Sequence, residues 1–174
     1  MTRRPSIFLC LLLSLLPLAA AAQDSGLLER IVRANSPSSA RADFIQRRHS
    51  PLLEGELLSE GRLYLLSPDK LRYEQTKPVQ KLSILDGSAA RGRFRVPSFD
   101  DFEISLLQDG KKLSLVMDPR RRDLRQLFTR VVLEVDPSSL LVQKVLLLGL
   151  DGNSTLLEFK NLQLDVQLDE SLFE

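Results

Sequence analysis

The spacing of apolar residues constrains the fold of this chain more than any other feature. From about residue 41 to residue 164, apolar and polar side chains alternate with a period of two, which is typical of β-strands. Turn-forming residues interrupt the alternation, and Asp109-Gly110 and Asp151-Gly152 are the strongest hairpin motifs. Short strands joined by tight turns indicate an antiparallel meander. About ten strands are predicted, near residues 41–49, 56–66, 70–76, 80–85, 89–96, 102–108, 111–117, 127–135, 140–150 and 154–164.

One helix is predicted before the strands. Asp24 or Ser25 can cap its start, and Ser36-Pro37 ends it because the residue before a proline disfavours helical dihedrals. Four apolar residues form a stripe at helical spacing: Leu27, Leu28, Ile31 and Val32. A helix this short needs a partner surface to be stable, so we expect it to lie as a lid over the sheet.

The apolar content of the strands indicates a sheet that curls on itself. Residues 145–150 are apolar on both strand faces, and leucine supplies 31 of the 152 residues that follow position 22. One helix cannot cover ten strands, so we predict a mainly β fold, a half-open antiparallel β-barrel with the helix covering its hollow. Composition alone favours an ordinary leucine core. The alternative is a hollow lined by aliphatic side chains and suited to acyl chains.

The first 22 residues have the layout of a secretory signal peptide. Arg3 and Arg4 precede an apolar run over residues 7–18, and Ala20-Ala21-Ala22 supplies a small-residue cleavage site. The run is shorter than the roughly 20 residues that span a bilayer. We therefore predict a signal peptide over 1–22, cleavage before Gln23, and a single domain over 23–174 in the periplasm.

Composition argues against several classes of function. The segment after residue 22 has 22 basic and 23 acidic residues, which disfavours a nucleic-acid binder. The one cysteine, Cys10, lies in the predicted signal peptide, and His49 is the one histidine. No phosphate loop, zinc motif or nucleophile elbow occurs. We therefore expect no catalytic residue, no metal and no cofactor.

Several segments, in order along the chain, resemble the periplasmic outer-membrane lipoprotein carriers, the LolA-like proteins. Phe44-Ile45-Gln46 matches the family's F-x-Q strand, and the segment from Gly61 to Glu74 resembles its first hairpin. The pieces that follow are Thr76-Lys77-Pro78, Ile84-Leu85-Asp86-Gly87, Leu157-Glu158-Phe159-Lys160-Asn161 and Asp169-Glu170-Ser171-Leu172-Phe173.

The resemblance implies a half-open β-barrel that carries acyl chains of lipoproteins from the inner to the outer membrane. It implies lipoprotein or other lipid cargo, an inner-membrane transporter, an outer-membrane acceptor and transient membrane contact; we also expect a monomer. Two alternatives use the same fold: a lipid-sensing module, and an accessory protein for glycolipid or pigment export.

Strand parity places candidate residues in the hollow. The uncharged face of each strand should turn inward. The predicted lining is Leu63, Leu65, Leu71, Tyr73, Leu82, Ile84, Phe102, Ile104 and Leu106. Two basic groups are either solvated surface or docking sites for anionic headgroups or an acidic partner. They are Arg91, Arg93 and Arg95, and Arg120, Arg121 and Arg122.

Overall fold

The protein, analysed as a computed structural model, is built around one antiparallel sheet. The structure describes residues 16–66, 69–86 and 97–174. The nine strands are β1 (Ser39–His49), β2 (Glu56–Leu66), β3 (Lys70–Lys77), β4 (Lys81–Asp86), β5 (Phe102–Asp109), β6 (Lys112–Pro119), β7 (Arg130–Val135), β8 (Val142–Leu148) and β9 (Ser154–Leu164). Their order in the sheet is β4-β3-β2-β1-β9-β8-β7-β6-β5.

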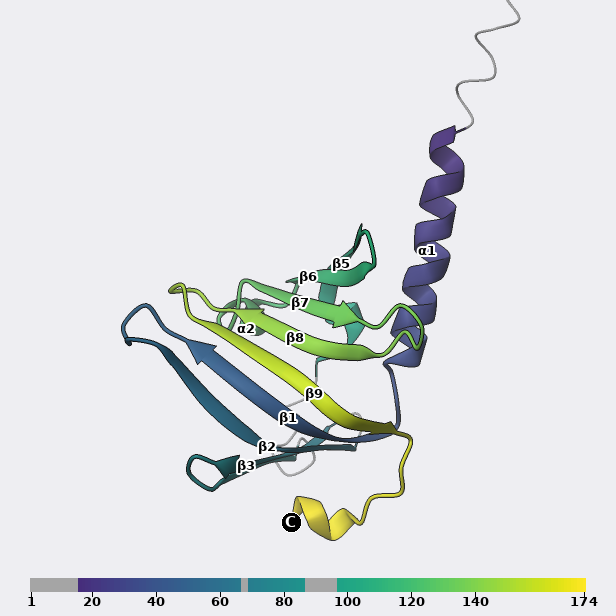
Figure 1. Cartoon of the computed structure of the whole chain (residues 1–174). Helices are drawn as coiled ribbons and strands as arrows, with labels where there is room; N and C mark the ends of the chain where they lie inside the picture. Colours follow the sequence, from purple (N-terminus) through teal and green to yellow (C-terminus); the bar gives the residue numbers. More distant parts are fainter. Residues whose placement is uncertain (1–15, 67–68, 87–96) are drawn as a thin grey trace, which may run out of the picture.

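This order explains why the barrel is half open. Each strand pairs with its neighbour in sequence except at the β4–β5 connection, and β9 pairs with β1. β4 and β5 are therefore the two edges, and the sheet curls without closing (Figure 1). The predicted mainly β, half-open fold is confirmed. The strand predicted over 89–96 lies outside the described residues.

Helix α1 (Leu16–Ala34) docks on the sheet through its last turns. It starts before the predicted cap at Asp24 or Ser25 and runs through the predicted cleavage site. Ile31 is fully buried, and Leu27 and Leu28 pack against the same core. Figure 1 shows the first turns of α1 projecting away from the sheet. No helix in the described parts of the chain is both long and apolar enough to cross a membrane.

The core lies on the concave face of β6, β7 and β8. Its buried residues include Leu113, Leu115 and Met117 of β6 and their cross-strand partners Val135, Leu133 and Val131 of β7. This alternation is the period of two seen in the sequence. The short helices η2 (Phe99–Asp101) and α2 (Arg122–Arg125) lie at the ends of β5 and β6.

The chain ends with a 3-10 helix, η3 (Glu170–Phe173), packed against β3 and β4. Arg72 Nη1 donates a 2.6 Å hydrogen bond to the carbonyl oxygen of Leu172. Phe173 is 4% exposed. Figure 1 shows this yellow segment below β3. Because Arg72 has the opposite parity to Leu71 and Tyr73, η3 covers the convex face of this end of the sheet.

Candidate functional site: an apolar hollow

The concave face of the sheet contains a hollow of about 370 Å³. Among the described residues, its lining is apolar apart from Asn35 and Ser98 and includes no ionisable side chain. The strands contribute Ala40, Ala42, Leu63, Leu65, Phe102, Met117, Val131, Leu133, Val142, Val145, Leu147, Phe159, Leu162 and Leu164. Asn35, Pro37, Pro97, Ser98, Phe99 and Phe128 come from the segments that flank them.

Two alanines of β1 give the hollow its depth. Ala42 lies opposite Leu63 of β2, and Ala40 lies between Leu65 of β2 and Leu164 of β9. The alanines are 2% and 9% exposed, so they form a floor between taller leucines. A larger side chain at either position would occupy the space above this floor.

A β-bulge in β9 sets which residues of that strand face the hollow. Asn161 has a φ of 53°, and the β1–β9 register shifts between Arg41 and Asp43. The Asn161 amide donates a 2.7 Å hydrogen bond to Asp43 Oδ2, which keeps Asn161 on the convex face. Because the bulge adds one residue, both Phe159 and Leu162 face inward.

Asn35 ties the end of α1 to the rim of the hollow. Its amide nitrogen donates to the carbonyl oxygen of Leu140 at 2.7 Å, and its amide oxygen accepts from the backbone N–H of Val142 at 2.9 Å. The same nitrogen donates to the carbonyl oxygen of Ile31 at 2.8 Å. One side chain therefore joins the last helical turn to the β7–β8 loop.

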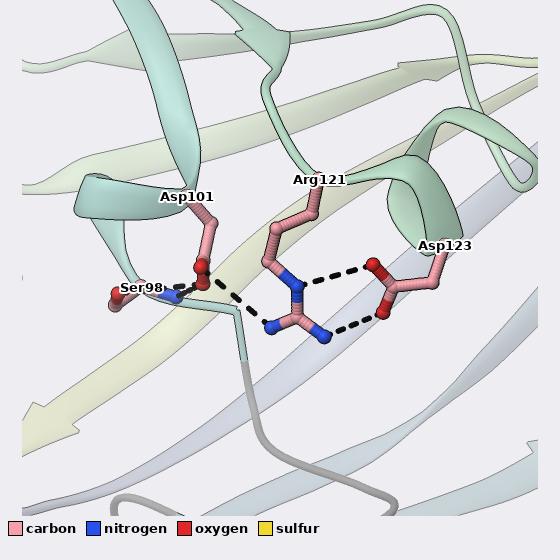
Figure 2. A network of polar contacts seen from close by, with 4 residues as sticks. All are labelled: Ser98, Asp101, Arg121 and Asp123. Carbon is pink, nitrogen blue, oxygen red and sulfur yellow. Dashed lines mark hydrogen bonds and ion pairs between the residues drawn. The ribbon is translucent and has the colours of Figure 1, made fainter.

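At another part of the rim of the hollow, polar contacts join η2 to the start of α2, as Figure 2 shows. Asp101 accepts from the backbone N–H of Ser98 at 2.8 Å and lies 3.6 Å from Arg121. Arg121 also pairs with Asp123. Its guanidinium holds the pKa of the Asp123 carboxyl below its usual value. These contacts fix the chain beside the stacked rings of Phe102 and Phe128, whose centroids are 6.2 Å apart.

The predicted lining residues separate into four groups. Leu63, Leu65 and Phe102 line the hollow. Leu71 and Tyr73 lie directly opposite Leu65 and Leu63, so they share the concave face, although neither borders the hollow. Ile104 and Leu106 pack against the core cluster.

Leu82 and Ile84 do not line the hollow. The β3–β4 register places Leu82 opposite Glu74 and Ile84 opposite Arg72. Residues directly opposite in an antiparallel pair share a face, so both apolar residues lie on the convex side with the charged pair. The η3 helix packs on part of β3 and β4; Ile84 is partly buried there, whereas Leu82 is 52% exposed.

The four predicted lid residues lie on α1. Ile31 is buried, Leu27 and Leu28 are partly buried against the core cluster, and Val32 is partly exposed. Asn35 and the two floor alanines were not predicted. Alternation could have identified the alanines, because Ala40, Ala42 and Phe44 share one face of β1.

The residues behind the family resemblance meet in one cluster on the concave face. The ring of Phe44 stacks on that of Tyr73, with centroids 4.6 Å apart. A Cβ atom on Gly61 would lie 2.6 Å from Phe44 Cζ, so the ring fits over a glycine. Tyr73 donates to Gln46 Oε1 at 3.1 Å.

The predicted docking arginines are only partly described. Arg91, Arg93 and Arg95 lie outside the described residues. Arg120 and Arg122 are exposed, whereas Arg121 is paired with acidic side chains. Arg130 also pairs with Asp118, at 2.7 Å. Acidic residues therefore neutralise part of this basic segment.

The described residues hold no group of three histidine, cysteine, aspartate or glutamate side chains arranged to bind a metal ion. The hollow itself offers two polar side chains and a large apolar surface. Such a surface can bind an apolar ligand by removing it from water.

Solved structures identify the fold. A LolA superfamily protein from Nitrosomonas europaea is 14% identical, with 87% of this chain and 97% of that chain covered and a TM-score of 0.51. The fold is LolA-like. A domain proposed to sort outer membrane lipoproteins, from Vibrio parahaemolyticus, is 12% identical, with 88% and 97% covered and a TM-score of 0.50.

MucB shares the LolA-like fold over part of its length. It is 18% identical, with 88% of this chain and 62% of MucB covered and a TM-score of 0.50. No protein-family model and no curated protein matches the chain. At sequence identities this low, the similarity to these structures shows the fold of the chain and nothing beyond the fold.

Proposed function

We propose that this protein is a periplasmic carrier that binds acyl chains of lipoproteins in the apolar hollow. It takes them from a transporter in the inner membrane to an acceptor in the outer membrane. The observation that carries the proposal is the hollow of about 370 Å³, whose described lining residues are all uncharged, in a sheet that does not close.

The chemistry of the hollow fits an acyl chain. Aliphatic chains need dry volume and no hydrogen bonds, and burial of each CH₂ group contributes about 0.8 kcal/mol. The hollow is at the lower end of the volumes of ligand pockets, which span roughly 300–1,000 Å³. The lining includes leucine side chains and Met117, and the unbranched methionine side chain can adapt to a flexible ligand.

A lipid-sensing module and an export accessory are the alternatives on the same fold. The lipoprotein carrier, the lipid-sensing module and the export accessory all need the same hollow. Its aliphatic walls do not distinguish between lipid headgroups or between transfer partners. Native mass spectrometry of the protein from the periplasm, with identification of co-purified acyl species, distinguishes lipoprotein cargo from glycolipid cargo. N-terminal sequencing of the same sample tests the predicted export and cleavage after Ala22.

The substitution Ala42→Phe tests whether the hollow is the binding site. The phenyl ring would rise from the floor and occupy the space that an acyl chain needs. We expect loss of binding to a fluorescent fatty-acyl probe, with a thermal midpoint close to that of the parent. If these walls were a packed core, the added ring would destabilise the fold by about 1–3 kcal/mol or more.

The matched control is Ile45→Phe on the convex side of the same strand. It adds a similar ring and should leave probe binding unchanged. Unchanged binding by a folded Ala42→Phe protein would contradict the assignment of the hollow.

A further inference from the structure

A second cavity, of about 450 Å³, lies on the same concave face at the other end of β1, β2 and β3. Its lining is Gln46, Arg48, Leu57, Leu58, Ser59, Tyr73, Gln75, Pro78 and Lys81. Gln46 lies four residues along β1 from Ala42, which is about 13 Å at about 3.3 Å per residue. We call this space the polar cavity.

The stacked rings of Phe44 and Tyr73 lie between the hollow and the polar cavity. Phe44 is two residues from Ala42 and two from Gln46 on the same strand face. Tyr73 lies opposite Leu63, which lines the hollow, while Tyr73 itself lines the polar cavity. Along one concave surface, polar and cationic side chains therefore join the apolar lining within a few residues, beside Leu57, Leu58 and Pro78.

Buried polar side chains form the wall of the polar cavity next to these rings. The Tyr73 hydroxyl donates to Gln46 Oε1 at 3.1 Å, and Gln46 Nε2 donates to Ser59 Oγ at 3.2 Å. Gln46 and Ser59 are 9% and 6% exposed. Burial raises the pKa of Tyr73, so its hydroxyl stays a neutral donor at physiological pH.

The charges that line the polar cavity are all positive. Arg48 and Lys81 are exposed at its mouth, no acidic side chain is among its described lining residues, and neither cation forms an ion pair with the described carboxylates. The outward cations nearby are paired: Arg47 with Glu158 at 2.7 Å, and Lys77 with Glu60 at 3.0 Å. The concave side of this end of the sheet is therefore the side that attracts an anion.

We propose that the polar cavity binds the phosphate-bearing headgroup of an amphiphile whose acyl chain lies in the apolar hollow. Arg48 and Lys81 contact the phosphate oxygens, and the ligand passes beside the Phe44–Tyr73 rings. The inference rests on the acyl-chain binding proposed for the hollow. It extends the cargo beyond lipoproteins, whose lipid anchor carries no phosphate, to lipids with an anionic phosphate headgroup.

Calorimetry with three probes tests the headgroup site on the chain that begins at Gln23. Dodecyl phosphate and dodecyl glucoside have the same chain but different headgroups, and inorganic phosphate has no chain; all are used below their micelle concentrations. We expect dodecyl phosphate to bind tightest. In Arg48→Gln/Lys81→Gln its affinity should fall about tenfold or more, with dodecyl glucoside unchanged, because charge-assisted contacts are lost.

The control Arg62→Gln/Lys160→Gln removes the same net charge from the convex face of β2 and β9. It should retain the affinity of the parent for all three probes. If both double variants lost affinity for dodecyl phosphate equally, the net charge of the protein would be what attracts the phosphate. This result would overturn the proposal.

Tyr73 provides a local readout. The chain has two tyrosines and no tryptophan, so Tyr64→Phe leaves Tyr73 as the one tyrosine. A bound phosphate disfavours the phenolate nearby, so dodecyl phosphate should raise the pKa of Tyr73 seen by ultraviolet absorbance. The shift should be absent with dodecyl glucoside and in the Arg48→Gln/Lys81→Gln background.

The results separate this inference from the proposed function. If both dodecyl probes bind the parent equally and the double variant changes neither, the headgroup site is wrong and the acyl carrier stands. If inorganic phosphate binds as tightly as dodecyl phosphate, the cavity is a free-anion site and the inference fails. If neither dodecyl probe binds, the proposed function itself fails.

Discussion

Gly61 illustrates how single residues maintain the concave face. A Cβ atom there would lie 1.9 Å from the carbonyl oxygen of Glu74 and 2.6 Å from Phe44 Cζ. The first contact is with backbone of the paired strand, which cannot rotate away. A glycine is therefore needed at position 61 because β3 and the Phe44 ring lie too close for any side chain, and not because the backbone has a positive φ.

We predict that Gly61→Ala destabilises the protein by at least about 3 kcal/mol, since the methyl group forces β2 and β3 apart. Urea unfolding followed by circular dichroism measures the change. The control is Gly26→Ala in α1, where no atom beyond the adjacent helix backbone lies within 4 Å of the added Cβ position. It should change the free energy of unfolding by no more than about 1 kcal/mol. A Gly61→Ala protein as stable as the parent would contradict the strand spacing described above.

At the scale of elements, hydrogen bonds between residues of the same turn help to fix how two strands are connected. The β7–β8 turn is organised by Asp136, whose Oδ1 accepts from the backbone N–H groups of Ser139 at 2.7 Å and Ser138 at 2.9 Å. The Ser139 hydroxyl also donates to it at 3.0 Å. These donors, the Ser139 N–H first, lower the pKa of the Asp136 carboxyl.

We expect Asp136→Asn to reduce the acid sensitivity of the fold. A carboxyl with a lowered pKa in the folded state stabilises it above the unfolded-state value of about 3.9 and loses this effect as pH falls through the folded-state value. Asparagine can accept the same hydrogen bonds without charge. Urea midpoints of the parent and variant should therefore differ at pH 7 and converge as the pH falls below the lowered folded-state pKa of Asp136. A gap between the two midpoints that stays constant with pH would contradict the turn's role.

Strand positions were predictable from the sequence, but their register was not. Alternation divides the residues of a strand between two faces, and the charges of Arg72 and Glu74 correctly placed Leu71 and Tyr73 on the concave one. The same reasoning failed for Leu82 and Ile84, because the face of β4 depends on its pairing with β3. The η3 helix packs against part of this convex face, and such long-range packing leaves no periodic pattern in the sequence; Leu82 itself remains exposed.

The bulge in β9 is a second feature that alternation could not locate. Phe159 and Leu162 differ in parity, yet both line the hollow because Asn161 adopts a φ of 53°. Asparagine tolerates this left-handed conformation better than most residues. The sequence contains the asparagine, but the bulge depends on its partner Asp43, which is 118 positions away.

At the scale of the whole molecule, one curled sheet carries two kinds of surface on its concave face. β6 to β9 present aliphatic side chains, and the far ends of β1 to β3 present hydroxyl, amide and cationic groups beside Leu57 and Leu58. The meander produces this arrangement because β9 returns to pair with β1, so the two halves share a floor. The general architecture followed from alternation and from the family resemblance. The size of the hollow did not, since it depends on two alanines within a leucine-rich face.

Substitution of Leu65 by glutamate distinguishes an open hollow from a filled core. Leu65 lines the hollow and is only partly buried, so Leu65→Glu can remain hydrated while the hollow is empty. In a filled core, an unpaired carboxylate would cost several kcal/mol and unfold the domain. We expect modest loss of thermal stability together with near-complete loss of fluorescent acyl-probe binding, because the charge would have to lose water to admit the chain.

The control for Leu65→Glu is Gln163→Glu, which introduces the same side chain on the convex face of β9. Gln163 accepts a 2.8 Å hydrogen bond from Arg41, so a glutamate there gains a cationic neighbour and stays in water. Its thermal midpoint and probe affinity should match those of the parent. A Leu65→Glu protein that is unfolded at room temperature would favour a filled barrel, since water then cannot reach the side chain. A folded Leu65→Glu protein with parental affinity would instead mean that acyl chains bind outside this hollow.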